Sequence, residues 1–199
     1  PCWLSNIKSL INVCNDADIS NPLPGVPHLA DANKIKLHLE SNFVKSWKHS
    51  LFDDTRKKQF GNKLRTYRTF KNEFVYEKYL DMIQPKAIRS SLAKFRISAH
   101  PLAIEKGRYG KYIPPDKRFC CFCNHKIEDE HHFIFECGLY DDLRQTVYRK
   151  IYIHLPNLLY MSSQDKLLLL MPSMKRDIIW PMSCFIHDAL NRRKDMLSM

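Results

Sequence analysis

A cluster of cysteine and histidine residues constrains the fold of this chain more than any other feature of its sequence. Cys120 and Cys123 are separated by two residues, eight residues then precede His132, and four more precede Cys137. A Cys-x2-Cys turn directs two thiolates at one ion, and a histidine followed by a cysteine can complete the tetrahedron that zinc prefers. The spacing therefore predicts a small CCHC zinc finger over residues 118–138.

Three neighbouring residues compete for these ligand positions. Cys121 adjoins Cys120, and His125 and His131 are alternatives to His132. If Cys121 replaced Cys120, a single residue would separate the two thiolates, so Cys120 is the better-spaced ligand. Because all four positions are filled, none remains for an activated water, and the zinc is expected to be structural. A cluster of thiols without a metal is the alternative interpretation.

The cysteine distribution and the apolar segments bear on the compartment. Four of the seven cysteines fall within residues 120–137, which is typical of a metal site and not of a disulfide framework. No signal sequence is visible, and the longest nearly apolar run, 178–186, is far shorter than the roughly 20 residues that a membrane span needs. We expect an intracellular protein, nuclear or cytoplasmic, with no membrane partner. The chain begins with Pro1, so we expect it to be a fragment of a longer protein.

Positive charge is concentrated in one third of the chain. The formal net charge is +11, and residues 56–118 hold 17 Lys or Arg against 5 Asp or Glu, while the rest is close to neutral. Such a surface is expected where a protein neutralises phosphates and releases their counterions. Aromatic residues such as Tyr67, Phe95 and Tyr109 are interleaved with the basic ones, which favours backbone contact with base stacking over binding to a membrane surface. The alternative is a basic protein that its charge keeps soluble.

Eleven residues are candidates for contact with the phosphates of RNA or DNA. They are Lys63, Arg65, Arg68, Lys71, Arg89, Lys94, Arg96, His100, Arg108, Lys111 and Arg118. Arg89 and Arg96 lie seven positions apart on one predicted helix, so they project together beside its apolar stripe. For each of the two, an arginine at the edge of the core, with only its charged end in water, is the alternative interpretation.

Apolar repeats predict a mainly α fold, in which the zinc finger is inserted into a helical module. We expect an N-terminal helix in residues 1–20, a Pro-rich linker over 21–32, a basic helical region over 33–117 and C-terminal helices over 139–199. The clearest amphipathic stripe runs over residues 35–51.

Two segments carry local signals that differ from a regular helix. Strand-like alternation occurs only at residues 133–135. In the last predicted helix the apolar stripe begins at Ile179, and Pro181 is expected in the first turn, because a proline further along removes a backbone hydrogen bond.

Three segments upstream of the cysteine cluster carry a resemblance to a known family. They are NKLRTYRTFK at 62–71, LAKFRISAH at 92–100 and IEKGRY at 104–109. Together with the cluster they resemble the C-terminal region of metazoan non-LTR retrotransposon reverse transcriptases, most closely that of jockey-type LINE polyproteins, over residues 62–144. The resemblance implies a region downstream of the polymerase fingers, palm and thumb that holds template RNA or target DNA during target-primed reverse transcription.

The resemblance also has implications for single residues. It assigns the metal ligands to Cys120, Cys123, His132 and Cys137. Five upstream residues fall on positions that are characteristic of the family, without individual roles that we can assign. They are Arg96, His100, Glu105, Gly107 and Arg108.

No catalytic centre is predicted, although Leu139-Tyr140-Asp141-Asp142 resembles the Tyr-x-Asp-Asp turn of reverse transcriptases. Position 139 is leucine, and two acids at a helix N-terminus are explained by the helix macrodipole. We therefore expect a nucleic-acid-binding region without enzyme activity of its own. Its expected partners are RNA or DNA and the reverse transcriptase core of the same polyprotein. The alternative is a zinc-stabilised protein-interaction module that docks on the polymerase core or on a host factor.

Overall fold

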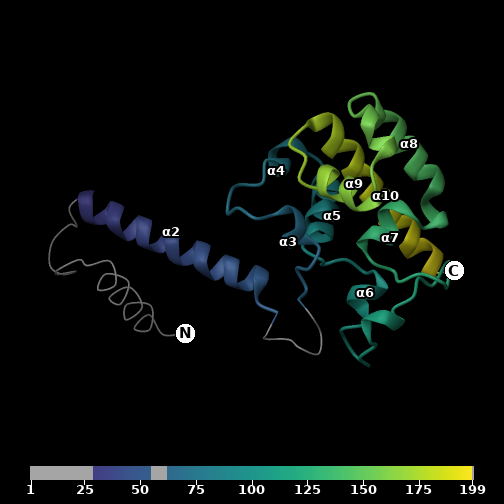
Figure 1. Ribbon diagram of the computed structural model, residues 1–199, viewed down its shortest axis with the longest axis horizontal. Helices are drawn as coiled ribbons and strands as arrows, with labels where there is room; N and C mark the ends of the chain where they lie inside the picture. Colours follow the sequence, from purple (N-terminus) through teal and green to yellow (C-terminus); the bar gives the residue numbers. More distant parts are fainter. Residues whose placement is uncertain (1–28, 55–61, 199) are drawn as a thin grey trace. The chain divides into compact units, whose positions relative to one another are not determined.

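The computed structural model of the chain describes residues 29–54 and 62–198, whose regular secondary structure is helical (Figure 1). Within these ranges there is no strand, and Phe119 and Ile127 form an isolated antiparallel bridge. The predicted mainly α fold is therefore confirmed. The helix that we predicted in residues 1–20 lies outside the described residues. No described helix is both long enough and apolar enough to cross a membrane.

The chain divides into two compact units, and the first unit ends at Asp53. Its described helix is α2, Leu29–Phe52, which confirms the helix predicted from the stripe over residues 35–51. α2 begins inside the segment 21–32 that we predicted as a linker. The side chain of Phe43, which belongs to the predicted stripe, is exposed.

The second unit begins at Asp54 and contains the other described helices. They are α3 (Tyr67–Phe70), α4 (Tyr79–Met82), α5 (Lys86–Arg96), α6 (Ala103–Lys106), η2 (Pro115–Lys117), α7 (Glu130–Phe135), η3 (Gly138–Tyr140), α8 (Asp141–Tyr152), η4 (Pro156–Tyr160), α9 (Ser163–Leu170) and α10 (Arg176–Ser198). The longest of these is α10, which packs against both α5 and α8. The shorter helices surround α5, α8 and α10 (Figure 1).

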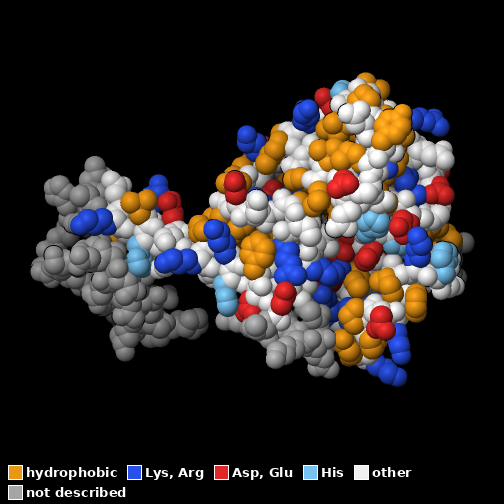
Figure 2. Space-filling view, viewed as in Figure 1, with side chains coloured by type: hydrophobic (Ala, Val, Ile, Leu, Met, Phe, Trp, Pro, Cys, Tyr) orange, Lys and Arg blue, Asp and Glu red, His pale blue; other side chains and the backbone are white. Residues whose placement is uncertain are grey.

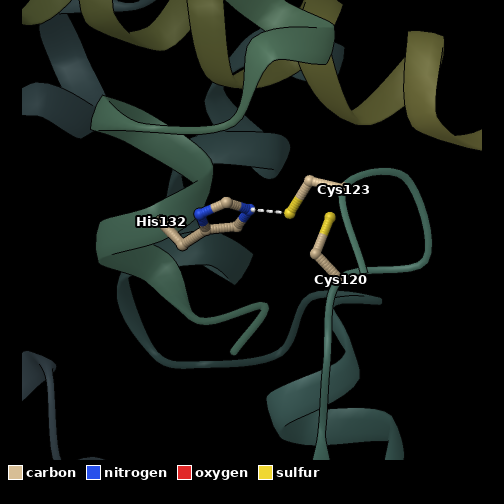
Figure 3. Close-up of side chains that lie close together, drawn as sticks. All are labelled: Cys120, Cys123 and His132. Carbon is tan, nitrogen blue, oxygen red and sulfur yellow. Dashed lines mark hydrogen bonds between the residues drawn. The ribbon is translucent and has the colours of Figure 1, made fainter. Parts of the chain in front are cut away.

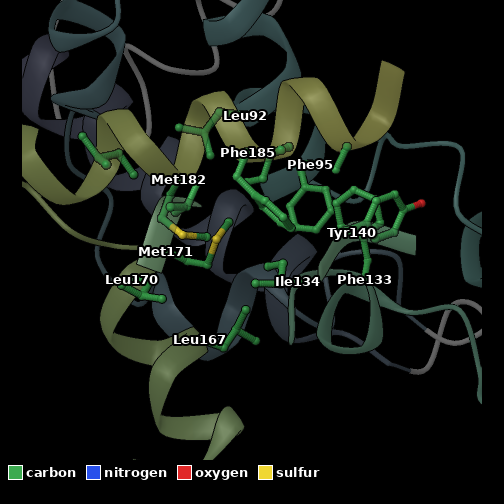
Figure 4. Packing of buried hydrophobic residues seen from close by; sticks show 14 of the residues in the cluster. Leu92, Phe95, Phe133, Ile134, Tyr140, Leu167, Leu170, Met171, Met182 and Phe185 are labelled. Carbon is green, nitrogen blue, oxygen red and sulfur yellow. The ribbon is translucent and has the colours of Figure 1, made fainter. Parts of the chain in front are cut away.

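The core of the second unit lies along one face of α10. Its apolar residues recur every three or four positions, so they share a face of the helix. The buried ones are Ile178, Ile179, Met182, Phe185, Ile186 and Ala189. Leu92 and Phe95 of α5 and Leu170 and Met171 at the end of α9 belong to the same cluster (Figure 4).

The short helix α7 is anchored in this core by Phe133 and Ile134, both almost fully buried. The ring centroid of Phe133 lies 4.7 Å from that of Tyr140 and 5.4 Å from that of Phe95 (Figure 4). Burying a large apolar side chain contributes about 1.5–3 kcal/mol. The segment that contains His132 is therefore part of the helical core and not a separate lobe.

Two local sequence signals differ from the structure. Residues 133–135 are helical, because the apolar run packs as one turn of α7 against the core. Pro181 is the sixth residue of α10, beyond the first turn, since the helix begins at Arg176. Proline has no N–H to donate to the carbonyl of Asp177. The buried neighbours Ile178 and Met182 offset that loss by packing in the core.

Candidate metal centre

The side chains of Cys120, Cys123 and His132 converge on one point (Figure 3). Their ligand atoms all lie within 4.8 Å of one another, and Cys123 Sγ is 3.5 Å from His132 Nε2. Cys137 extends the group, because its Sγ lies 3.9 Å from Cys120 Sγ. With zinc bond lengths of about 2.3 Å to sulfur and 2.0–2.1 Å to nitrogen, tetrahedral geometry places neighbouring donors about 3.5–3.8 Å apart. The Cys123–His132 and Cys120–Cys137 distances are close to the edges of such a tetrahedron, but Cys137 is not among the residues whose ligand atoms all lie within 4.8 Å of one another.

A tight turn presents the first two thiols. The backbone N–H of Cys120 donates to Lys126 O at 2.8 Å, and that of Asn124 donates to Cys120 O at 2.8 Å. Asn124 has a φ of 58°, in the left-handed region that asparagine tolerates better than most residues. These two hydrogen bonds and the backbone conformation of Asn124 define the turn.

The helix α7 presents the histidine. Asp129 caps α7 by accepting a hydrogen bond from the N–H of His132 at 2.8 Å. The helix ends after Phe135, and the N–H of Cys137 donates to His132 O at 2.9 Å. The four residues between His132 and Cys137 therefore span the end of one short helix.

The environment of His132 is typical of a metal-bound imidazole. Its Nε2 faces the thiol of Cys123, and its Nδ1 lies 3.4 Å from Glu136 Oε2. Metal-ligating histidines usually donate their second ring N–H to a carboxylate or carbonyl, which orients the ring. Lys126 pairs with Glu136 at 2.9 Å, and this hydrogen bond lowers the pKa of that carboxyl.

The three alternative ligands do not join the cluster. Cys121 is exposed, and the ring of His125 bonds to Cys123 O at 2.6 Å. His131 is paired with Glu136, with Nδ1 to Oε1 at 3.5 Å. In the part of the chain that the structure describes, Cys120, Cys123 and His132 form the only group of three or more such residues that could hold a metal ion.

Burial affects the thiols in different ways. It raises the pKa of Cys120 to about 12 and also raises the pKa of Cys137. At Cys123 burial acts in the same direction, but backbone N–H groups of His125 and Lys126 outweigh it and lower the pKa. A bound cation would favour thiolates at all three positions.

Comparisons with protein families, curated proteins and solved structures find no match to this chain. The chemistry of the site is therefore argued from its own residues. Two sulfurs and one imidazole nitrogen form a group that could hold a divalent cation, Cys137 Sγ lies beside Cys120 Sγ, and Glu136 supports the imidazole. The cluster could hold a metal ion, and with these four ligands it would leave no open position for water.

Several of the predicted phosphate-binding residues lie in an internal network. Arg65 donates to Glu105, and its Nη2 lies 2.7 Å from Glu130 Oε2. His100 Nε2 lies 2.9 Å from Glu130 Oε1, and Arg108 Nε lies 3.0 Å from Glu105 Oε2. Burial opposes ionisation of Glu130, but the hydrogen bond with His100 and the charge of Arg65 lower its pKa to about 2.

A second set of predicted residues surrounds Glu77. Arg96 is only 3% exposed, and its Nη2 lies 2.9 Å from Glu77 Oε2. The Cζ atom of its guanidinium lies 4.8 Å from the ring centroid of Phe70. Lys71 Nζ lies 3.0 Å from Glu77 Oε1. Arg89 donates instead to Ile83 O at 2.9 Å. Arg89 and Arg96 therefore do not project together into solvent, and the core-edge interpretation fits Arg96.

The remaining predicted residues differ in exposure. Arg118 is 2% exposed and donates to Ile113 O at 2.8 Å, while Arg68 pairs with Asp54 at 2.9 Å. Lys94 and Lys111 are exposed, and Lys63 is partly exposed. Lys106 and Lys117, which were not among the eleven predicted residues, are also exposed. The one sequence signal that could have indicated the exposure of both lysines was a position in a loop or at a helix end.

The acidic pair that resembles a polymerase motif has a structural role. Asp141 and Asp142 are the first two residues of α8, as predicted. Asp141 pairs with Arg144, and Asp142 Oδ2 accepts from Arg192 at 2.8 Å. Both carboxylates thus stabilise the start of α8, where the helix dipole favours negative charge.

Proposed function

We propose that this chain is a nucleic-acid-binding module whose fold is held by a structural zinc ion at Cys120, Cys123, His132 and Cys137. The observation that carries the proposal is the convergence of Cys120, Cys123 and His132, with Cys137 Sγ 3.9 Å from Cys120 Sγ, because thiolates and imidazoles are the donors that zinc favours. A structural zinc contributes on the order of 10 kcal/mol or more of apparent binding free energy. Since α7 is anchored in the core through Phe133, the ion would stabilise the helical unit as well as the finger.

Two features support binding of RNA or DNA. The chain carries a formal net charge of +11, and exposed lysines, among them Lys94, Lys106, Lys111 and Lys117, remain after the internal pairs are formed. The resemblance to non-LTR reverse transcriptases suggests the same role for this region, with the polymerase core as a further partner inside the cell. Contacts from lysine to phosphate hold the backbone and carry little sequence information. We expect weak sequence preference and no catalytic activity in this chain.

An exposed apolar surface supports a second candidate function, a protein-interaction module. On η4 and the turn before it, Ile153, Leu159 and Tyr160 are exposed, Tyr160 by 89%. Docking through such residues would depend little on salt, whereas phosphate contacts weaken steeply as salt rises. The salt dependence of binding therefore separates the two functions.

The first experiment is a titration of the whole chain with labelled single-stranded RNA and duplex DNA at low and moderate salt, with zinc measured in the same preparation. The proposal expects stoichiometric zinc and binding to at least one polyanion that weakens as salt rises. Absence of binding to both at low salt would rule out the nucleic-acid function. Absence of zinc from folded protein would rule out the structural role of the ion.

A further inference from the structure

A cavity of about 230 Å³ lies next to the candidate metal centre. Its walls come from α6, from the loop that follows α6, and from the turn that carries the first cysteines. The side chains that matter most are Lys106, Tyr109, Lys111, Lys117, Arg118 and Phe119. Figure 2 shows lysine or arginine side chains beside a group of hydrophobic ones over α6 and this loop.

The walls of the cavity are positively charged. Among the residues that the structure describes, no ion pair involves Lys106, Lys111 or Lys117, and all three are exposed. The one acidic side chain in the walls, Glu128, is already bound by Arg193, with two hydrogen bonds of 2.7 Å each. An anion in the cavity would therefore meet three lysine ammonium groups that form no ion pair with any described carboxylate.

The buried guanidinium of Arg118 adds a fixed positive charge beside the cavity. Its Nε donates to Ile113 O at 2.8 Å and its Nη1 to Ile104 O at 2.5 Å. Its Nη2 is buried and has no hydrogen-bond partner among the described residues.

The same cavity offers aromatic surface. Tyr109 is 64% exposed and Phe119 is 48% exposed, although rings of this size are usually buried. Exposed rings among lysines are the combination by which proteins hold single-stranded nucleic acids, because each base can stack on a ring while its phosphate meets a cation.

The loop that carries Tyr109 and Lys111 is held in place before any ligand binds. The N–H of Ile113 donates to Gly107 O at 3.0 Å, which closes the loop, and Arg118 holds Ile113 O from the other side. A preformed loop loses less conformational entropy on binding than a mobile one. The loop is therefore suited to hold a ligand in one orientation.

We propose that this cavity seats one nucleotide of a single-stranded nucleic acid, with its phosphate on the lysines and its base stacked on Tyr109 or Phe119. The inference rests on the proposed function and narrows it to single strands, since a base inside a duplex does not expose its face to a protein ring. The volume is below the roughly 300–1,000 Å³ of sites that enclose a drug-sized ligand, so the cavity could hold part of one nucleotide while the rest of the strand stays on the surface.

The test compares two double variants of the whole chain that remove the same residue types. Tyr109→Ala with Lys111→Ala alters the cavity, and Tyr160→Ala with Lys175→Ala removes an exposed tyrosine and an exposed lysine that do not line it. The probes are a fluorescein-labelled single-stranded RNA of about 12 nucleotides and a DNA duplex of the same length, within the range of single-strand site sizes. Zinc content and circular dichroism show that each variant is folded.

We expect the cavity variant to bind the single strand at least fivefold more weakly than the parent chain, because one lost stacking contact corresponds to about 1–3 kcal/mol. Its affinity for the duplex should fall by less, and the control variant should match the parent chain on both probes. Equal affinity of the cavity variant and the parent chain would overturn the inference while leaving the proposed function intact. An equal loss on both probes would overturn the preference for single strands. If the parent chain binds neither probe, the proposed function itself fails.

A second measurement tests whether a bound strand covers the cavity. Cys121 lines it and is exposed, so a bound strand should slow alkylation of that thiol, whereas Cys184, which does not line it, should react at an unchanged rate. Mass spectrometry of the alkylated peptides gives both rates in one sample. Protection of Cys121 alone supports the inference, and unchanged reactivity of Cys121 with the strand bound would overturn it.

Discussion

Gly107 leaves the space through which the side chain of Arg118 passes. A β-carbon built on Gly107 would lie 2.5 Å from Arg118 Nε and 2.8 Å from its Cδ, closer than atoms can approach. Arg118 is confined there by its hydrogen bonds to Ile104 O and Ile113 O. The absence of a side chain at position 107 is therefore a packing requirement.

The variant Gly107→Ala should lower the free energy of unfolding by about 1–3 kcal/mol, the usual cost of inserting a methyl group into a well-packed site. Denaturant unfolding of the zinc-loaded protein measures this loss. Gly138→Ala is the matched control, because its added β-carbon would meet only Asp141 Oδ2, at 3.8 Å, an ordinary contact. Equal stability of Gly107→Ala and the parent chain would show that Arg118 can leave its place at little cost.

Cys121 and Cys123 provide a direct test of the ligand assignment. Cys123→Ser should lose zinc, since its Sγ faces His132 Nε2 at 3.5 Å, whereas Cys121→Ser should retain it, because that thiol is exposed and outside the cluster. Metal analysis of the two purified variants gives the answer. Equal loss from both would contradict the assignment.

The cap of α7 should affect the metal site more than an ordinary helix cap does. Asp129→Ala removes the hydrogen bond to the N–H of His132 and should cost about 1 kcal/mol of stability. It should also weaken zinc binding, measured by competition with a chelator, because the imidazole loses part of its support. Ser162→Ala removes the comparable cap of α9 and should lower stability alone. Equal zinc affinity in both variants would show that Asp129 is only a cap.

The features that could be predicted from the sequence depend on short spacings. Cys120 and Cys123 share a turn and His132 lies on the short helix that follows, so their spacing was enough to indicate the cluster of three, and Cys137 lies beside Cys120. The stripe over 35–51 indicated α2 in the same way. Periodicity could not distinguish an apolar helical turn at 133–135 from a strand, because only the packing of Phe133 in the core decides between them.

Which basic side chains form internal ion pairs could not be predicted, because their acidic partners are distant in the sequence. Arg65 meets Glu130, 65 residues away, and Arg96 meets Glu77, 19 residues away. The charge of residues 56–118 includes Arg65 as available for phosphate, although it is paired with Glu105 inside that segment and with Glu130 outside it. Only the tertiary fold brings such pairs together, and it leaves a smaller set of exposed lysines.

Glu130 should make stability depend on pH in the acid range. Its pKa is lowered from the usual 4.5 to about 2, so the ionised form stabilises the fold above about 4.5 and this contribution is lost as the pH falls toward 2. The difference corresponds to about 3 kcal/mol at most. Glu130→Gln should be less stable than the parent chain near neutral pH, and the gap should shrink through this window. Urea unfolding of both proteins at several pH values measures the gap, and a constant gap would contradict the role of the carboxylate.

Arg96 and Lys94 lie two residues apart on α5, but substitution of Arg96 should lower stability, whereas substitution of Lys94 should weaken nucleic-acid binding. Arg96→Ala removes a buried charge from Glu77 and from the ring of Phe70, and we expect it to cost about 2–3 kcal/mol of stability, less than for an isolated pair because Lys71 remains beside Glu77. Lys94→Ala removes an exposed side chain, so it should change stability by less than about 0.5 kcal/mol. Under the proposed function, Lys94→Ala should weaken binding to single-stranded RNA and reduce its salt dependence. Urea unfolding and RNA titration of both variants separate the two roles. If Arg96→Ala proved as stable as the parent chain but lost RNA binding, Arg96 would be a phosphate contact, as the sequence pattern alone predicted.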